Sequence, residues 1–151
     1  MQLDNLQAVR FAVSLSLHFT AKRPAYKLRL TEALSINHMN LLFVCSENRL
    51  RSPTGEEVFS KFAGVEAIGC GTNADASTPL SGDLIEWADV IFVMEKSHRN
   101  KVSKKFRALL KNTRLICLDI PDDYERMDPV LVRLLENRVL RHVPHIRRGN
   151  A

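Results

Sequence analysis

The segment "CSENRLRS", residues 45–52, places an arginine six positions after a cysteine. A cysteine thiolate is a strong nucleophile, and an arginine guanidinium can hold two oxygens of an oxyanion at once. Backbone N–H groups at a helix N-terminus also attract anions. These groups together could bind a phosphate-like oxyanion through Arg51 and attack it through Cys45.

The residues on either side of this segment predict the elements that position it. Leu41 to Val44 form a short apolar run, which is typical of a strand buried on both faces. Ser52 is a good N-cap residue, and Pro53 is well tolerated at the first position of a helix. Residues 45–51 are therefore predicted to be a loop between a buried strand and a helix N-terminus.

Within this loop, successive backbone N–H groups would meet the oxyanion. Positive surroundings favour the thiolate form of Cys45, and the Ser52 hydroxyl is close enough in sequence to hydrogen-bond its sulfur. Asn48 could brace the loop by hydrogen-bonding its own backbone. The alternative for Cys45 is a small buried hydrophobic residue. We expect the substrate-binding residues of the loop to be Ser46, Glu47, Asn48, Arg49, Leu50 and Ser52.

Strand and helix patterns alternate along the chain from Met39 onward. Strands are predicted at 40–45, 65–70, 89–94 and 114–118, and helices at about 53–63, 84–88, 97–111 and 129–142. Ser97 is the predicted N-cap of the third helix, and Asp128-Pro129 is predicted to open the last. This alternation predicts an α/β fold with three layers, in which helices flank a four-stranded parallel sheet of flavodoxin-like topology. Ligands of such sheets bind beyond the carboxyl ends of the strands, where Cys45 and residues 119–123 are expected to meet.

The composition limits the class of protein. The chain has 151 residues, of which 45% are apolar and 26% are charged, which fits one globular domain. The chain has a net charge of +5, and residues 1–38, with five Lys/Arg and two Asp/Glu, contribute +3 of it. Positive and negative charges are therefore nearly balanced in the remaining residues, which does not favour nucleic-acid binding. No apolar run approaches the roughly 20 residues of a membrane span, so no membrane association is expected.

The three cysteines, Cys45, Cys70 and Cys117, form no CxxC pair. This pattern argues against a disulfide framework or a zinc site, and it favours reduced thiols in the cytoplasm. We predict neither a metal nor an organic cofactor. The oligomeric state is left open.

The predicted domain covers residues 39–143, and the segments before and after it are predicted to lie outside this domain. Residues 1–38 are interpreted as an extension that is loosely packed or not native, since Met39 directly precedes the first strand; an added helix is the alternative. A secretory signal is weakly supported, because Asp4 precedes the apolar run. Residues 144–151 are predicted to be a frayed basic tail.

Cys45, five intervening residues, Arg51, Ser52 and Pro53 resemble the phosphate-binding loop of the low-molecular-weight protein tyrosine phosphatase family. Asn48 falls on the loop-bracing asparagine of that family. The segments "IGCGT" and "ADVIFVMEKSHRNKV" also resemble it, so that the similarity spans most of 39–143. The resemblance implies the phosphotyrosine phosphatase I topology, a phosphocysteine intermediate and a phosphorylated protein or small molecule as substrate.

The resemblance also implies a general acid. The segment "IPDDY" corresponds to an Asp-Pro-Tyr loop, with Asp122 at the acid's position, Asp123 in place of the proline, and Tyr124 on the tyrosine that flanks the substrate. Asp119 and Asp123 remain rivals, because neighbouring carboxylates can raise one another's pKa. A solvated turn is the alternative for all three aspartates.

Three further features depart from the family pattern. Glu47 brings a carboxylate into an anion-binding loop, where it would oppose phosphate unless its side chain points outward. Leu50 stands where many members carry a second cysteine that protects the nucleophile by forming a disulfide. Residues 72–80 lack an aromatic wall for the substrate, which leaves a preference for phosphotyrosine open.

Other residues favour structural roles. We expect Trp87 to pack against the sheet, and we expect no function for His98 or His142. The basic residues of the helix at 97–111 are interpreted as a solvated face, with a docking surface for an acidic partner as the alternative.

The predicted function is a cysteine-dependent phosphatase. One alternative is a non-catalytic module that binds phosphate or a phosphoprotein. Another is an arsenate reductase, which would need two further reactive cysteines; Cys70 and Cys117 instead lie at core-like positions.

Overall fold

The computed structural model describes residues 38–148. Residues 1–37, which hold nearly all of the predicted N-terminal extension, and residues 149–151 of the predicted tail lie outside the described residues. Between residues 38 and 148, strands and helices alternate in the predicted order.

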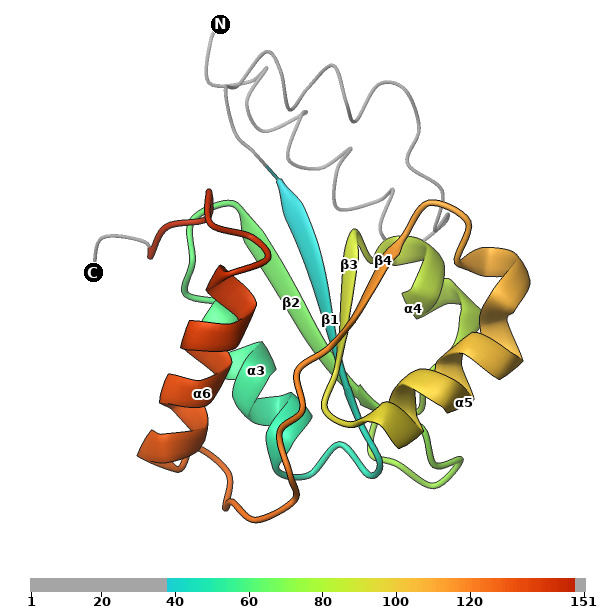
Figure 1. The fold of residues 1–151 in the computed structure, drawn as a ribbon, viewed down its shortest axis with the longest axis horizontal. Coiled ribbons are helices and arrows are strands. Elements are labelled where there is room, and N and C mark those ends of the chain that lie inside the picture. Colours follow the sequence, from blue (N-terminus) through green and yellow to red (C-terminus); the bar gives the residue numbers. More distant parts are fainter. Residues whose placement is uncertain (1–37, 149–151) are drawn as a thin grey trace, which may run out of the picture.

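A four-stranded sheet forms the centre of the fold (Figure 1). All its strand pairs are parallel, in the order β2-β1-β3-β4. The predicted fold class is therefore confirmed. Since β2 and β3 lie on opposite sides of β1, the switch point falls at the carboxyl ends of β1 and β3. The strands are β1 (Met39–Cys45), β2 (Val65–Gly71), β3 (Val90–Val93) and β4 (Arg114–Cys117).

Helices cover both faces of this sheet, as predicted. Figure 1 shows α3 and α6 on one face and α4 and α5 on the other. None of the described helices is long and apolar enough to cross a membrane. The helices are α3 (Arg51–Phe59), α4 (Gly82–Trp87), α5 (Lys96–Phe106) with the 3-10 turn η1 (Arg107–Leu109), and α6 (Pro129–Leu140).

The central strand β1 is buried on both faces because successive side chains alternate between two cores. Leu41 and Phe43 belong to the cluster beneath α3 and α6, whereas Leu42 and Val44 belong to the cluster beneath α4 and α5. The Phe43 ring lies 5.4 Å from the Phe59 ring and 5.5 Å from the Phe92 ring, centroid to centroid. Burial of β1 fixes the position at which the following loop leaves the sheet.

The start of α3 differs from the prediction. The helix begins at Arg51 with Leu50 as its N-cap, so the prediction of Ser52 as the N-cap is wrong. The Ser52 hydroxyl is instead turned into the preceding loop, where it donates to the Asn48 side chain. Pro53 becomes the third helical residue, which is tolerated because the first four N–H groups of a helix have no intrahelical acceptor. The helix also ends at Phe59 rather than near residue 63.

The start of α5 differs in the same way. Its N-cap is Glu95 rather than the predicted Ser97, because the Glu95 side chain accepts a hydrogen bond from the His98 N–H and the His98 side chain accepts from the Glu95 N–H. This reciprocal capping box satisfies two backbone donors, whereas a Ser97 cap would satisfy one. The α-helix ends at Phe106, short of the predicted Lys111.

Residues 144–148 pack onto the domain instead of fraying. Ile146 is 5% exposed and belongs to the core cluster beneath α3 and α6. The Ala63 N–H donates to the Arg147 carbonyl at 2.8 Å, and Phe62 pairs with Arg148 in an antiparallel bridge. The domain therefore extends past the predicted boundary at Val143. The prediction that Trp87 packs against the sheet is confirmed, since it is 8% exposed within a core cluster.

Candidate active site

The loop between β1 and α3 turns its carbonyl groups to one side. The carbonyl of Cys45 accepts from the Thr72 N–H at 2.9 Å, and that of Ser46 accepts from the Asn73 N–H at 2.9 Å. The Glu47 carbonyl accepts from the Ser77 N–H at 3.4 Å. In a trans peptide the N–H points opposite to the C=O, so the next three N–H groups face the interior of the loop. This is the arrangement of an anion-binding nest.

Cys45 lies inside this nest, at the carboxyl end of β1, and is 4% exposed. Its Sγ accepts from the Asn48 N–H at 3.2 Å and lies 2.8 Å from the Ser52 Oγ. The Ser52 hydroxyl donates to the Asn48 Oδ1 at 2.7 Å. If this hydroxyl proton rotates toward a Cys45 thiolate, the sulfur accepts a second hydrogen bond in addition to the one from the Asn48 N–H. The predicted contact between Ser52 and Cys45 is thus present.

Asn48 braces the loop, although by other bonds than those predicted. Its backbone φ is 56°, in the left-handed region that asparagine adopts more readily than most residues. The predicted hydrogen bond to its own backbone is replaced by bonds to two serines. Its Oδ1 accepts from Ser52, and its Nδ2 donates to the Ser77 Oγ at 3.2 Å. Ser77 in turn donates to the Asn48 carbonyl at 2.9 Å.

Two glycines of β2 let the loop pack directly on the sheet. A Cβ added to Gly71 would lie 2.4 Å from the Ser46 carbonyl oxygen. A Cβ added to Gly69 would lie 2.8 Å from the Asn48 Oδ1 and from the Ser52 carbonyl oxygen. Both contacts are too short for a side chain, so the loop geometry requires glycine at these positions.

Arg51 is the first residue of α3, and its side chain is 4% exposed. Its Nη1 donates to the Ile120 carbonyl at 2.8 Å and pairs with the Glu95 carboxylate. Its Nε lies 3.4 Å from the Asp122 Oδ1. Groups that follow β3 and β4 therefore hold the guanidinium at the switch point, beside the loop that contains Cys45.

His98 also reaches the loop, although the sequence indicated an isolated histidine. It is 2% exposed, and its Nε2 lies 2.9 Å from the Ser46 Oγ. Its Nδ1 accepts from the Glu95 N–H at 3.1 Å, so the proton is on Nε2 and is donated to Ser46. Burial, followed by the nearby Arg51 guanidinium, lowers the pKa of His98 to about 4, which keeps the ring neutral.

Glu95 and His98 were both missed as parts of the site. The sequence does contain a signal for them, because Glu and His at N-cap and N3 can form a capping box at a helix start. That signal places a helix end, but it does not tell which loop the helix end faces. The parallel pairing of β1 with β3 brings this helix end beside residues 45–51.

Among the three candidate acids, Asp122 is the one in contact with Arg51 within the described residues. Its side chain is 63% exposed, at the rim of the site. The Asp119 carboxylate instead accepts from the Cys117 thiol at 3.4 Å. Asp123 is exposed, and Tyr124 is half-buried against the core cluster that includes Cys45.

The carboxylate of Glu47 does not face the nest. The Glu47 side chain is 54% exposed, and it lies 3.5 Å from the guanidinium of Arg49, which is 74% exposed. The two side chains form a pair at the surface of the loop. The concern that Glu47 opposes a bound anion from inside the loop is therefore removed by its orientation.

The other two cysteines lie apart from the nucleophile. Cys70 is fully buried in the cluster beneath α4 and α5, on the opposite face of the sheet from Cys45. Burial raises the pKa of the Cys70 thiol far above its ordinary value. Cys117 is half-buried rather than in the core, and burial raises its pKa as well. Residues 38–148 contain no group of three or more His, Cys, Asp or Glu side chains that could hold a metal ion.

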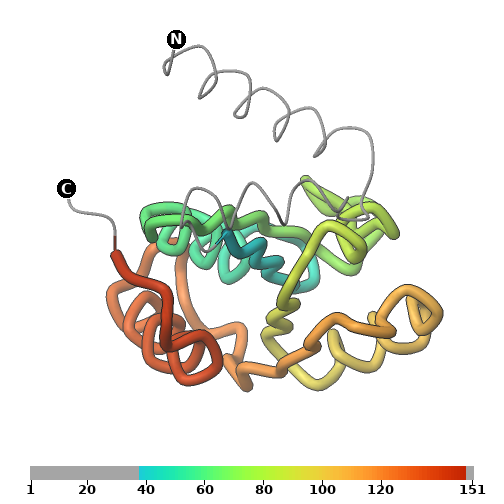
Figure 2. Tube along the Cα trace, turned by 90° about the horizontal axis from the view of Figure 1, so that it is seen from above, coloured from blue at the N-terminus to red at the C-terminus, as the bar shows by residue number. Residues whose placement is uncertain are grey.

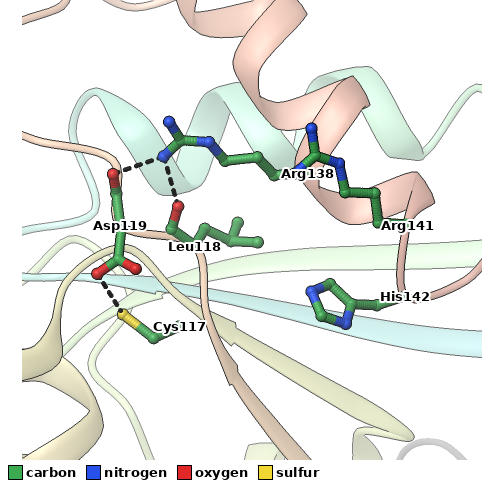
Figure 3. Close-up of a pocket in the computed structure, with 6 residues that line it drawn as sticks. All are labelled: Cys117, Leu118, Asp119, Arg138, Arg141 and His142. Carbon is green, nitrogen blue, oxygen red and sulfur yellow. Dashed lines mark hydrogen bonds between the residues drawn. The ribbon is translucent and has the colours of Figure 1, made fainter.

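A cleft of about 330 Å³ lies between the end of β4 and α6 (Figure 3). None of its lining residues belongs to the loop that contains Cys45. Its Arg138 donates from Nη1 to the carbonyls of Leu118 and Asp119, both at 2.6 Å (Figure 3). Since Arg51 binds the carbonyl of Ile120, two arginines hold three successive carbonyls of the segment that leads to Asp122. The cleft is lined by Cys117, Leu118, Asp119, Arg138, Arg141 and His142.

Comparison with known proteins identifies the fold. No family model matches the chain, and no curated protein matches it. Several solved structures do resemble it. The YwlE arginine phosphatase from Geobacillus stearothermophilus is 19% identical, with a TM-score of 0.54, over 70% of this chain and 93% of that chain.

Two further solved structures are similar to a comparable degree. The tyrosine phosphatase Wzb from Escherichia coli K30, in complex with phosphate, is 20% identical with a TM-score of 0.57, over 71% of this chain and 97% of that chain. A low-molecular-weight phosphotyrosine phosphatase from Vibrio cholerae O395 is 18% identical with a TM-score of 0.56, over 70% and 95%. The chain thus has the fold of the low-molecular-weight protein tyrosine phosphatases.

Proposed function

We propose that this protein is a cysteine-dependent phosphatase of the low-molecular-weight protein tyrosine phosphatase family, which hydrolyses phosphomonoesters through a phosphocysteine intermediate. The observation that carries the proposal is the position of the Cys45 sulfur. It lies 3.2 Å from the Asn48 nitrogen and 2.8 Å from the Ser52 Oγ, inside a loop whose carbonyls are turned away. The buried Arg51 beside it supplies the positive charge that a phosphate dianion requires.

In the first step, the loop N–H groups and Arg51 hold the non-bridging oxygens of the phosphate. The Cys45 thiolate attacks phosphorus, so that an S–P bond forms while the P–O bond to the leaving group breaks. Asp122 donates a proton to the leaving oxygen, which avoids the release of a poorly stabilised alkoxide or phenoxide. The contact of Asp122 with Arg51 at 3.4 Å supports its place at this step.

In the second step, water attacks the phosphorus of the phosphocysteine. Asp122, now ionised, accepts a proton from that water, and the electron pair of the S–P bond returns to sulfur. The Ser52 hydroxyl and the Asn48 N–H are placed to stabilise the departing thiolate. The products are inorganic phosphate and the regenerated thiolate, and no metal or cofactor takes part in this scheme.

The substrate class includes phosphoproteins, with phosphotyrosine as one candidate. The similar structures carry two activities in their names, since one is a tyrosine phosphatase and another an arginine phosphatase. Residues 72–80 contain no aromatic side chain to stack on a phenyl ring. Both phosphotyrosine and phosphoarginine peptides therefore belong in the substrate panel. The three free thiols support a reducing compartment such as the cytoplasm.

A non-catalytic phosphate-binding module is the second candidate. It is favoured by the acid loop, where Asp123 replaces the family's proline and the Asp122 side chain is 63% exposed. A poorly held acid would leave binding intact while slowing turnover. An arsenate reductase is disfavoured, because Cys70 faces the other side of the sheet from Cys45.

The test is steady-state hydrolysis of para-nitrophenyl phosphate across pH by the wild type, Cys45→Ser and Asp122→Asn. We expect turnover by the wild type, none by Cys45→Ser, and slow turnover by Asp122→Asn with the alkaline decline of the profile lost. A wild type that binds vanadate but turns over no faster than Cys45→Ser would overturn the proposal in favour of the binding module.

A further inference from the structure

The modest net charge of the domain conceals a strong asymmetry along the chain. Residues 96–118 contain eight Lys/Arg and no Asp/Glu. Residues 38–95 contain three Lys/Arg and nine Asp/Glu, and residues 119–148 contain six of each. Positive charge is therefore concentrated on α5 and the turn that follows it.

These cations form one surface, which we call the basic helix surface. The inner side of α5 is occupied by His98, Val102 and the partly buried Phe106, so the cations lie on its outer side and flanks. All six members are exposed, and none forms an ion pair with a carboxylate among residues 38–148. The members are Lys96, Arg99, Lys101, Lys104, Lys105 and Arg107.

A role in stabilising the helix does not explain this arrangement. Lys104 and Lys105 lie in the last turn, where cations complement the helix dipole, but Lys96 and Arg99 lie near its positive end. Lys101 also precedes Lys104 and Lys105 by three and four residues, a spacing at which like charges repel. An acidic partner would relieve this repulsion.

The basic helix surface starts at the candidate active site. The residue before α5, Glu95, pairs with Arg51, and His98 contacts Ser46 in the loop. Figure 1 shows α5 beginning at the end of the sheet where β1 enters α3, and Figure 2 shows α5 and α6 on separate sides of the molecule. With 11 residues, α5 extends about 16 Å away from that site.

We propose that the basic helix surface docks an acidic segment of a phosphoprotein substrate whose phosphorylated residue occupies the Cys45 loop. This inference rests on the proposed phosphatase function. A protein segment fits better than a nucleic acid, because a long polyanion would extend past this surface to the rest of the domain, where residues 38–95 carry nine Asp/Glu and three Lys/Arg. A short extended segment, at about 3.3 Å per residue, reaches Lys101 to Lys105 from the site with about four to eight residues.

The test uses two phosphopeptides that differ only in their flanks. One carries Asp and Glu at about four to eight residues on either side of the phosphorylated residue, and the other carries Asn and Gln there. The variant is Lys101→Gln, Lys104→Gln and Lys105→Gln, since glutamine matches lysine in helix propensity. The control neutralises three exposed cations outside α5: Lys61→Gln, Arg133→Gln and Arg141→Gln.

We expect the wild type to prefer the acidic peptide by about tenfold in kcat/KM at low salt, and the preference to shrink as salt rises. The triple variant should lose the preference, whereas the control should keep it. All three proteins should hydrolyse para-nitrophenyl phosphate at equal rates. Equal preference in the wild type and the triple variant would overturn the docking proposal while leaving the phosphatase proposal standing.

A binding measurement separates the two proposals fully. Fluorescence anisotropy with an unphosphorylated acidic peptide reports on the surface even if no substrate is turned over. Weaker binding by the triple variant than by the control supports the proposal. If the triple variant instead binds this peptide as the control does, but loses affinity for anionic vesicles or single-stranded DNA, the surface serves another partner and the proposal fails.

Discussion

At the scale of single residues, the site depends on how one hydroxyl proton is shared. The Ser52 Oγ lies 2.8 Å from the Cys45 sulfur and donates to the Asn48 Oδ1 at 2.7 Å. While sulfur is a thiol, it can donate to Ser52. Once sulfur carries negative charge, the same hydroxyl can rotate and donate to it. Ser52 thus matters most when the thiolate is the leaving group.

Replacement of Ser52 by alanine should therefore slow hydrolysis of the phosphocysteine more than its formation. We expect kcat for para-nitrophenyl phosphate to fall by about tenfold or more, since loss of a hydrogen bond to a charged group costs about 1.5–3 kcal/mol. A burst of p-nitrophenol, close to one equivalent per enzyme, should precede the slow steady state. Rapid-quench or stopped-flow measurements would detect it, and a linear time course without a burst would contradict this assignment.

His98 makes a pH-dependent contribution to stability. Its pKa in the folded protein is about 4, below the ordinary 6.5, so the unfolded chain binds more protons between these values. The contribution is fully present above pH 6.5 and is lost as pH falls toward 4, by at most about 3 kcal/mol. His98→Gln should flatten this decline in urea unfolding between pH 7.5 and 4.5. His145→Gln, at an exposed position, is the control and should leave the decline unchanged.

Arg138 positions the acid-bearing segment without contacting Cys45. It binds the carbonyls of Leu118 and Asp119, and its loss would release the segment that leads to Asp122. We expect Arg138→Met to lower kcat/KM for phenyl phosphate by about tenfold and for para-nitrophenyl phosphate by less, because a poorer leaving group needs the acid more. Arg141→Met, at a residue that lines the same cleft, should leave kcat/KM unchanged for both substrates. Equal losses for both substrates would indicate a merely structural role for Arg138.

At the scale of the elements, β2 determines how closely the loop packs on the sheet. Its alternation sends Val65 and Ala67 into the core beneath α3 and α6, and the same face continues as Gly69 and Gly71 under the loop. A side chain at either glycine would push the loop away from the strand. The glycines of "IGCGT" are thus a packing requirement of the site.

Gly71→Ala tests this requirement. Its Cβ would lie 2.4 Å from the Ser46 carbonyl oxygen, which is backbone and cannot rotate aside. We expect unfolding free energy to fall by about 1–3 kcal/mol and kcat/KM to fall with it. Gly82→Ala is the matched control, since its Cβ would meet only the flexible tip of Leu109 at 3.2 Å. A Gly71→Ala variant with wild-type activity would show that the loop tolerates a shift.

At the scale of the whole molecule, the sheet separates the cysteines. Cys45 and Cys70 lie in cores on opposite faces, although their strands are neighbours. A disulfide between them would require the backbone of one strand to turn over. Position 50 is a leucine, so the loop that contains Cys45 has no second cysteine.

Peroxide should therefore oxidise Cys45 without forming an internal disulfide. We expect intact mass spectrometry after brief treatment to show added oxygen, as sulfenic and then sulfinic acid, and no loss of two hydrogens. Activity should return with thiol only at the sulfenic stage. A disulfide linking Cys45 to Cys70 or Cys117 in a peptide map would contradict the separation seen in the fold.

The sequence alone determined the fold class, the strands and the loop between β1 and α3 that contains Cys45, because these depend on local patterns. Apolar runs mark buried strands, and the spacing of Cys45 and Arg51 is set within one loop. The start of α6 was likewise predicted, since the Asp128 cap and Pro129 act through adjacent backbone. Helix starts with rival cap residues were misplaced by two positions, since the N-caps are Leu50 and Glu95 rather than Ser52 and Ser97.

Only the tertiary structure decided which distant groups complete the site. The pairing of β1 with β3 brings Glu95 to Arg51 and His98 to Ser46, across about fifty residues of chain. Whether Glu47 faces the anion or the solvent depended on a backbone path that no local pattern encodes. Contacts between residues this far apart leave no periodic pattern in the sequence, because strand order and packing determine them rather than neighbouring residues.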